Sequence, residues 1–258
     1  MTIPFQCGKL LLDASGNLYG TASSGGANSA GLVFKLTPSA NGWTETVLYN
    51  FTSGADGGFP NAGMIARGSS LYGVTYGGGA SGNGTVFQLT PSKAGWKESV
   101  LYSFAGGSDG ASPEGGVLFD QAGNLYGTTS LGGNTGYGTV YKLAHSLSGW
   151  TENVIYTFGG GNDGANPIAS LIFDKAGSLY GTTLGSTTGG PAGTAFKLSP
   201  TQTGWSETVL HSFTGGNDGA NPYASLLLLG SDLFGSTRAG GSSGIGSMGK
   251  GVIFRIVP

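Results

Sequence analysis

A unit of about 54 residues recurs five times along this chain and constrains its fold more than any other feature. Its clearest marker is Leu-Tyr-Gly, or Leu-Phe-Gly in the last copy, which begins at residues 18, 71, 125, 179 and 233. Consecutive markers are therefore 53, 54, 54 and 54 residues apart. Periods of this order are typical of propellers, solenoids and arrays, in which each repeat is one supersecondary unit. We expect a single domain of repeats spanning residues 1–258.

Each unit contains four short runs rich in aromatic and β-branched residues. In the third unit they are residues 117–120, 124–129, 138–143 and 151–158. Gly, Asn or Asp bounds each run, which is the signal of a strand, and no helical periodicity is visible. Asp120 and Gly123 indicate a tight turn between the first two strands. Four-stranded antiparallel units at this spacing are the blades of a propeller, so the sequence predicts an all-β, five-bladed β-propeller.

The fifth unit is incomplete. It ends after its expected third strand, residues 252–256, and lacks the Gly-Trp pair that begins the fourth strand of the other units. The first strand of the first unit is expected at residues 9–13, with eight residues before it. Either residues 2–5 complete the fifth blade or its edge stays open. An open edge would favour a homo-oligomer, because unpaired strands attract other chains.

Charge and cysteine content exclude several partners. Charged residues make up 9% of the chain and its net charge is −2, so no basic surface for nucleic acid or for a membrane is expected. Cys7 is the single cysteine, which rules out an intrachain disulfide and a cysteine metal cluster. No apolar run of about 18 residues occurs, and residues 1–8 lack the features of a signal peptide. A soluble protein without membrane insertion is expected.

Three blocks of sequence resemble a known family. They are GNLYGTT (123–129), GYGTVYKL (136–143) and NDGANP (162–167), and related blocks occur in nearly every unit. The chain is similar to the Gloeo/Verruco, or GloVer, tandem repeat, a family of bacterial proteins with varied C-terminal sorting anchors. The resemblance implies a bacterial propeller of extracellular or surface origin, although this chain shows no signal peptide or anchor. It brings no assigned reaction and no catalytic residues.

The informative positions are those at which the repeat is broken. Six residues before the turn of each first hairpin, five equivalent positions carry five different side chains: Cys7, Asn61, Glu114, Ile168 and Tyr223. Two residues further on, Lys9 replaces a small residue found in every other unit, namely Gly63, Gly116, Ser170 or Ser225. Cys7, Lys9, Glu114 and Tyr223 are therefore predicted to converge at one end of the central axis as catalytic residues with perturbed pKa values. The alternative is a plug of the tunnel with an incidental ion pair.

Aspartates and asparagines recur in the loops that join one unit to the next. An Asp-Gly pair occupies each such loop, at Asp56, Asp109, Asp163 and Asp218. These carboxylates would bind Ca²⁺, or would hold the loop by accepting its backbone N–H groups, the interpretation we favour. Together with Asn61, Asn166 and Asn221, the carboxylates of Asp109, Asp163 and Asp218 are candidates for binding the hydroxyl groups of a ligand. No other cofactor is expected.

Three functions remain open. A hydrolase acting on a small molecule or glycan would use one asymmetric site around Glu114. A lectin-like propeller would instead bind glycans in repeated pockets between blades, and a scaffold would bind through its surface alone. Neither His145 nor His211 is expected beside the predicted catalytic residues at the end of the central tunnel, which argues against a Ser-His-Asp hydrolase. Because repeated pockets would not require a broken repeat at the centre, the sequence favours the hydrolase.

Overall fold

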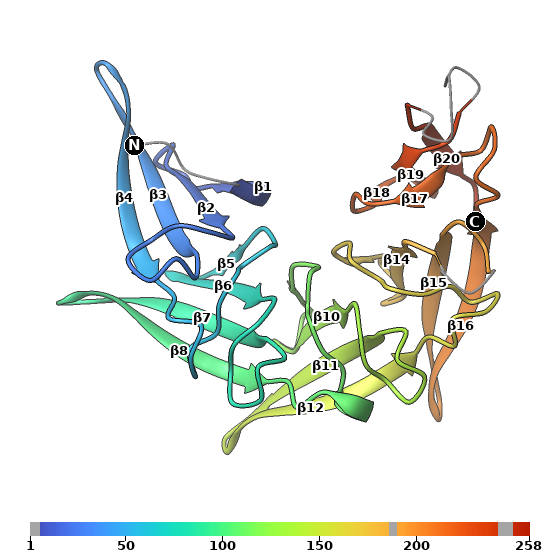
Figure 1. Cartoon of the computed structure of the whole chain (residues 1–258), viewed down its shortest axis with the longest axis horizontal. Helices are drawn as coiled ribbons and strands as arrows, with labels where there is room; N and C mark the ends of the chain where they lie inside the picture. Colours follow the sequence, from blue (N-terminus) through green and yellow to red (C-terminus); the bar gives the residue numbers. More distant parts are fainter. Residues whose placement is uncertain (1–5, 186–189, 242–249) are drawn as a thin grey trace.

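The protein is an all-β propeller of five four-stranded antiparallel blades (Figure 1). The computed structural model describes residues 6–185, 190–241 and 250–258. Within them the only helical element is the 3-10 turn η1, Gly107–Asp109. The fold predicted from the repeat is confirmed.

Each of the first four blades takes its strands in chain order. The first and second blades contain β1 (Gln6–Leu12), β2 (Leu18–Ala22), β3 (Leu32–Ser39), β4 (Gly42–Asn50), β5 (Ile65–Arg67), β6 (Ser70–Thr75), β7 (Thr85–Ser92) and β8 (Gly95–Ser103). The third and fourth contain β9 (Leu118–Phe119), β10 (Leu125–Thr129), β11 (Thr139–Ser146), β12 (Gly149–Thr157), β13 (Ile172–Phe173), β14 (Leu179–Thr183), β15 (Thr194–Thr201) and β16 (Gly204–Ser212). The fifth contains β17 (Ala220–Pro222), β18 (Leu227–Leu229), β19 (Asp232–Ala239) and β20 (Ile253–Ile256).

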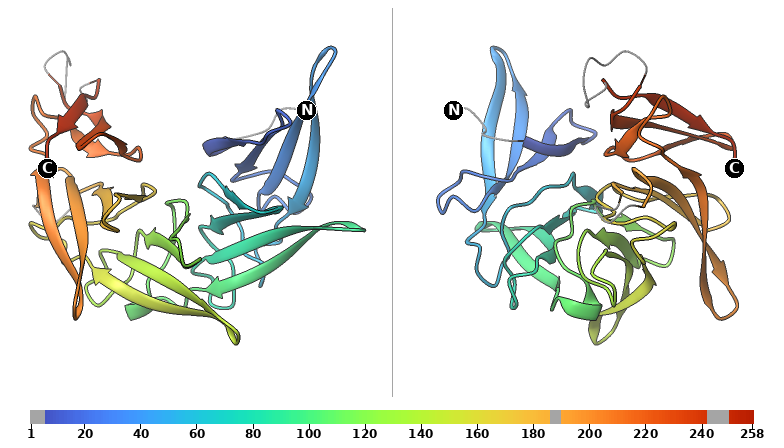
Figure 2. Two further views of the ribbon diagram at one scale, coloured as in Figure 1. Left: turned by 180° about the vertical axis from the view of Figure 1, so that it is seen from behind. Right: turned by 45° about the vertical axis from the view of Figure 1, so that its right-hand side comes forward.

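The first strands of the blades lie nearest the common axis and the fourth strands form the rim, where long hairpins project (Figures 1 and 2). In the third blade the outer hairpin pairs Thr139 with Thr157 and continues to Ser146 and Gly149. The third strand thus begins one residue later and ends three residues later than the predicted 138–143. Its extension, Ala-His-Ser, is mostly solvent-exposed and carries no hydrophobic alternation, so the sequence pattern does not reveal it.

The glycine of each Leu-Tyr-Gly marker is required by packing. A Cβ atom on Gly127 would lie 2.4 Å from the Tyr141 hydroxyl oxygen, and one on Gly73 would lie 2.7 Å from the Phe87 ring. In every blade an aromatic side chain of the third strand lies directly over this glycine. Any larger residue would displace that ring, which explains why the repeat keeps glycine here.

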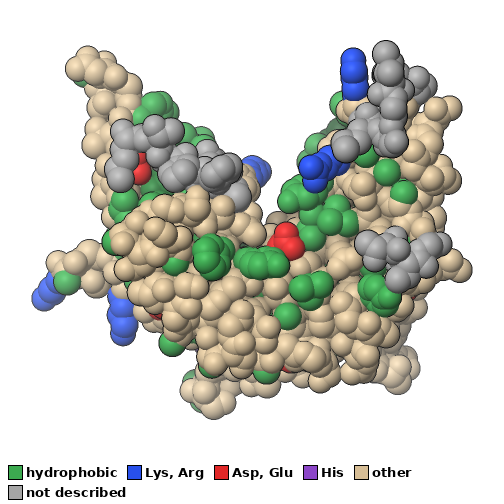
Figure 3. Space-filling model, in the orientation of Figure 1, with side chains coloured by type: hydrophobic (Ala, Val, Ile, Leu, Met, Phe, Trp, Pro, Cys, Tyr) green, Lys and Arg blue, Asp and Glu red, His purple; other side chains and the backbone are tan. Residues whose placement is uncertain are grey.

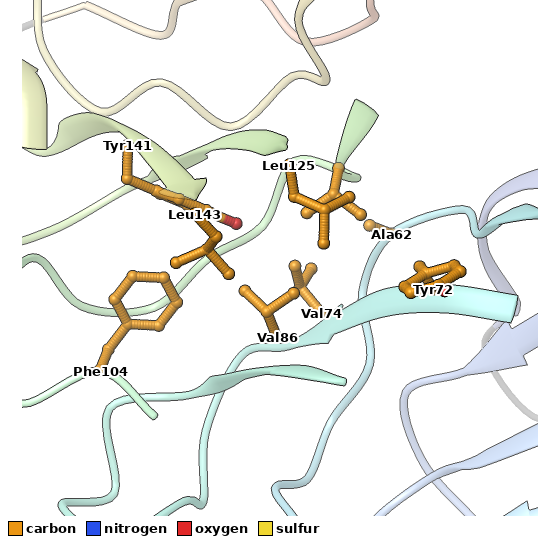
Figure 4. Packing of buried hydrophobic residues seen from close by; sticks show 9 residues of the cluster. Ala62, Tyr72, Val74, Val86, Phe104, Leu125, Tyr141 and Leu143 are labelled. Atoms are coloured by element: carbon orange, nitrogen blue, oxygen red, sulfur yellow. The ribbon is translucent and has the colours of Figure 1, made fainter. Parts of the chain in front are cut away.

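The hydrophobic core lies between neighbouring blades. Figure 4 shows the cluster shared by the second and third blades, in which Val74, Val86 and Phe104 face Leu125 and Tyr141. Tryptophan at the start of each fourth strand covers the rim of such a cluster. The Trp96 ring lies 6.5 Å from that of Tyr19 in the preceding blade, and the Trp205 ring lies 6.1 Å from that of Tyr126. No blade precedes the first, and Trp43 there is 53% exposed.

The two ends of the chain do not close the ring among the described residues. In the fifth blade, β17, β18 and β20 all pair with β19, so its four strands include no described equivalent of the outer strands β4, β8, β12 and β16. The described N-terminal strand β1 pairs with β2 and belongs to the first blade. Residues 2–5, the predicted alternative for closing the fifth blade, lie outside the described residues. A V-shaped opening separates the first and fifth blades (Figure 3).

Nowhere in the described ranges is there a helix long and apolar enough to cross a membrane.

Candidate functional site

The starts of the innermost strands pack backbone against backbone around the axis. A Cβ atom on Gly63 would lie 2.7 Å from the Lys9 carbonyl oxygen, and one on Gly116 would lie 2.8 Å from the Gly63 carbonyl oxygen. The Gly116 N–H in turn donates to the Ser170 hydroxyl at 2.8 Å. Lys9, Gly63 and Gly116 therefore occupy equivalent places, as their spacing in the repeat predicts.

Glu114 precedes β9, the inner strand of the third blade. This blade is the middle one of the arc and lies opposite the opening (Figure 1). Glu114 follows buried Pro113 and is itself half-buried. Burial raises the pKa of the Glu114 carboxyl above its ordinary value, and a hydrogen bond with Ser130 partly offsets this by stabilising the ionised form. Glu114 therefore holds a proton more readily than an exposed glutamate, which suits it to acid–base chemistry.

Ser130 anchors Glu114 to the neighbouring loops. Its hydroxyl donates to the Ser112 carbonyl oxygen at 2.9 Å, and its own carbonyl oxygen accepts from the Asn166 side-chain amide at 2.9 Å. The serine is 4% exposed. Because the hydroxyl has one proton, ionised Glu114 competes with the Ser112 carbonyl for it.

The other predicted catalytic residues belong to the first and fifth blades, which border the opening. Lys9 is exposed on the first blade and forms no ion pair with Glu114 in the part of the chain that the structure describes. Tyr223 lies on the fifth blade and is 53% exposed. The Cys7 backbone pairs with Thr21 in the first blade, but its side chain is not among those described.

The three candidate asparagines are placed differently. Asn61 is half-buried at the start of the second blade's inner strand, in the place that Glu114 takes in the third. Asn166 has a positive φ of 57° and uses its amide nitrogen to hold Ser130. Asn221 also has a positive φ, 53°, and lines a lateral pocket of about 670 Å³ beside Phe213 and Leu184. The third asparagine thus lines a cavity large enough for a ligand of sugar size.

The loop aspartates support the scaffold. Each accepts a backbone N–H of its own loop and a polar group at the end of the preceding fourth strand. The hydroxyl-to-carboxylate distances are 3.0 Å for Tyr49 and Asp56, 2.7 Å for Tyr102 and Asp109, and 3.1 Å for Tyr156 and Asp163. His211 takes the place of the tyrosine beside Asp218, with its Nε2 3.3 Å from the carboxylate. These contacts favour the structural interpretation of the four residues over a Ca²⁺ site.

A second set of equivalent positions, one in each blade, also departs from the repeat, and the sequence analysis missed it. The fifth residue after the leucine of each marker varies among the blades. It is Ser23, Tyr76, Ser130 and Leu184 directly after the second strand of the first four blades, and Arg238 inside β19 of the fifth. Each lies beside the inter-blade loop, as the bonds from the Tyr76, Ser130 and Leu184 N–H groups to the loop carbonyl oxygens of Phe59, Ser112 and Asn166 show. Counting five residues from each Leu-Tyr-Gly marker would have found this set.

A family comparison identifies the repeat. The model of the Gloeobacter/Verrucomicrobia repeat matches residues 5–183. The chain belongs to this family. No curated protein matches the sequence of this Gloeobacter/Verrucomicrobia repeat protein.

Solved structures share the propeller fold at low sequence identity. A protein of unknown function from Dyadobacter fermentans aligns with a TM-score of 0.53 at 11% identity, covering 90% of this chain and 74% of the other. A GH43_1 enzyme from Xanthomonas citri, solved with xylotriose, aligns with a TM-score of 0.51 at 12% identity, covering 92% and 83%. An α-L-arabinofuranosidase from Clostridium thermocellum has a TM-score of 0.50 at 12% identity, covering 90% and 81%. At these identities the likeness concerns the fold.

Proposed function

We propose that this repeat protein is a glycan hydrolase whose substrate enters through the opening between the first and fifth blades and binds at the axial mouth beside Glu114. The observation that carries the proposal is the position of Glu114, a half-buried carboxyl with a raised pKa at the axis, with Ser130 as its polar partner. Glu114 would act as the general acid that protonates the leaving oxygen of the glycosidic bond. The sugar substrates of propellers with the same fold are consistent with this class.

A second candidate is non-catalytic glycan binding. Glycosidases commonly use two carboxylates on either side of the scissile bond. Among the described residues no charged neighbour contributes to the pKa of Glu114, so no second carboxylate is indicated beside it. A propeller with one axial carboxyl would bind the same glycan without cleaving it.

Replacing Glu114 by Gln separates the two candidates. For a hydrolase we expect Glu114→Gln to lower kcat on aryl glycosides and xylo-oligosaccharides by about 10²- to 10⁴-fold, because the proton donor is lost. The change from carboxyl to amide keeps the shape, so Tm should stay within a few degrees.

Release of reducing ends measures the activity, and calorimetric titration with the same sugars measures binding. Equal kcat in both proteins would refute the role of Glu114. Binding without cleavage by the parent protein would establish the lectin-like function. A protein that neither binds nor cleaves any of these sugars would exclude both.

A further inference from the structure

Tyr223 and Arg238 occupy the positions in the fifth blade that Glu114 and Ser130 occupy in the third. Backbone pairing demonstrates the equivalence. Ala220 pairs with Ala239 in the fifth blade, as Ala111 pairs with Leu131 in the third. The next pair is Pro222 with Thr237. Tyr223 follows Pro222 and Arg238 follows Thr237, so the two residues flank the same pair.

Both side chains are unengaged within the described part of the protein. Tyr223 is 53% exposed and Arg238 is also exposed, and neither has a hydrogen bond or ion pair with a described residue. Five of the ten other cations of the chain, including both other arginines, are held in place. Four lie over aromatic rings, Lys35 on Tyr19, Lys142 on Tyr126, Lys197 on Tyr180 and Arg67 on Phe119, and Arg255 lies 2.6 Å from Asp232. A guanidinium left free beside an exposed phenol is available for a ligand.

The charge at the mouth is opposite to that of the whole molecule. The chain has a net charge of −2, yet Lys9 and Arg238 stand on the two blades that border the opening, with Glu114 on the blade across from it. Figure 3 shows basic side chains on both walls of the opening and an acidic side chain at its floor. Two cations therefore stand against one carboxyl here, and this positive balance favours an anionic ligand.

We infer that Arg238 is a specificity-determining residue that binds the carboxylate of an acidic sugar, so that the substrate class is a glycan containing uronic acid. This inference rests on the proposed function. The planar guanidinium of Arg238 matches a carboxylate with two parallel hydrogen bonds. The Tyr223 ring offers an apolar face to the sugar and a hydroxyl at its edge.

The test compares an acidic trisaccharide, tri-galacturonate, with neutral xylotriose by calorimetric titration of the full chain. We expect the parent protein to bind tri-galacturonate about 10- to 100-fold more tightly, as expected for a hydrogen-bonded charge pair. Arg238→Gln should reduce the ratio of the two affinities to about one. The matched control is Lys97→Gln, which removes one positive charge from an exposed position on the rim of the second blade and should leave the ratio unchanged.

Each other outcome has a definite meaning. Equal affinity for both sugars, with no effect of Arg238→Gln, overturns the inference and leaves the proposed function standing. If a sulfated trisaccharide binds more tightly than tri-galacturonate, Arg238 recognises a sulfate ester, and the inference of a carboxylate ligand is overturned. A loss of preference in Lys97→Gln equal to that in Arg238→Gln shows a general field effect and overturns the specific role of Arg238. Absence of binding to every glycan rejects the inference together with the proposed function.

Discussion

At the scale of single residues, each side chain of this protein can be compared with its four equivalents in the other blades. Shared residues have structural roles: Gly127 lies under an aromatic ring, and Asp163 holds its loop through Tyr156 and a backbone N–H. Residues that differ gather at the axial mouth, where Glu114 and Ser130 make a contact that the other blades cannot make with the same chemistry. The candidate site is therefore defined by departures from the repeat.

The role of Ser130 can be tested through the pH dependence of activity. Ser130 stabilises ionised Glu114, so Ser130→Ala should raise the pKa of Glu114 further. The limb of the pH profile of kcat/KM that reports Glu114 should move to higher pH, by about one unit for the loss of one hydrogen bond. Ser23→Ala, the equivalent change in the first blade, is the matched control and should leave that limb in place. An unchanged profile in Ser130→Ala would restrict Ser130 to a packing role.

At the scale of elements, the fourth strands carry a glutamate that faces the inter-blade loop. Burial and the nearby charge of Asp56 raise the pKa of Glu98 to about 7. Burial and Asp109 raise the pKa of Glu152 to about 8, and burial and Asp163 raise that of Glu207 to about 7. Tyr49, Tyr102 and Tyr156 face the same aspartates, and Tyr141 faces Glu152. One buried carboxyl oxygen of each glutamate has no hydrogen-bond partner.

These glutamates should make the stability of the propeller depend on pH. In the unfolded chain a glutamate ionises near its ordinary pKa of 4.5, whereas in the folded protein these three ionise near 7 to 8. Their contribution is therefore fully favourable below pH 4.5 and is lost as the pH rises to about 8. We expect the free energy of unfolding to fall between pH 5.5 and pH 8.5 by about 1 kcal/mol per glutamate, after allowance for solvent screening. Tm should fall with it.

The triple variant Glu98→Gln, Glu152→Gln and Glu207→Gln should flatten this dependence, because the amide stays neutral and can donate to the aspartate. Glu45→Gln is the matched control. Glu45 has the same strand position in the first blade, which no inter-blade aspartate precedes, so its replacement should leave the slope unchanged. Thermal unfolding from pH 5.5 to 8.5 measures all three proteins. A parent Tm independent of pH would contradict the assignment.

At the scale of the whole molecule, the arc exposes two faces that the other blades bury. Ile253 of the fifth blade is 84% exposed, whereas its equivalents are fully buried: Val33, Val86, Val140 and Ala195. Trp43 and Leu227 are similarly exposed on the first and fifth blades. Exposed apolar faces of this kind favour association.

We expect the full chain to self-associate through the open edge of the fifth blade as its concentration rises, with light scattering as the measurement. Ile253→Asp should reduce the mass and change the unfolding free energy by less than about 0.5 kcal/mol, since the site is exposed. Val140→Asp, at the equivalent buried position, should destabilise by about 3 kcal/mol or more. A monomer at all concentrations would disprove the association, and equal destabilisation by both variants would show that the arc is closed in solution.

The sequence by itself determined the number of blades, their strand order, the equivalence of Lys9, Gly63 and Gly116, and the position of Glu114 in the segment that leads into an inner strand. These follow from local patterns repeated five times, so that errors in one copy are corrected by the others. Only the tertiary structure decided that Ser130 is the partner of Glu114, that Lys9 does not pair with it, and that the arc stays open between the first and fifth blades. The angle between neighbouring blades depends on how their side chains pack, and the repeat period carries no information about the sum of those angles.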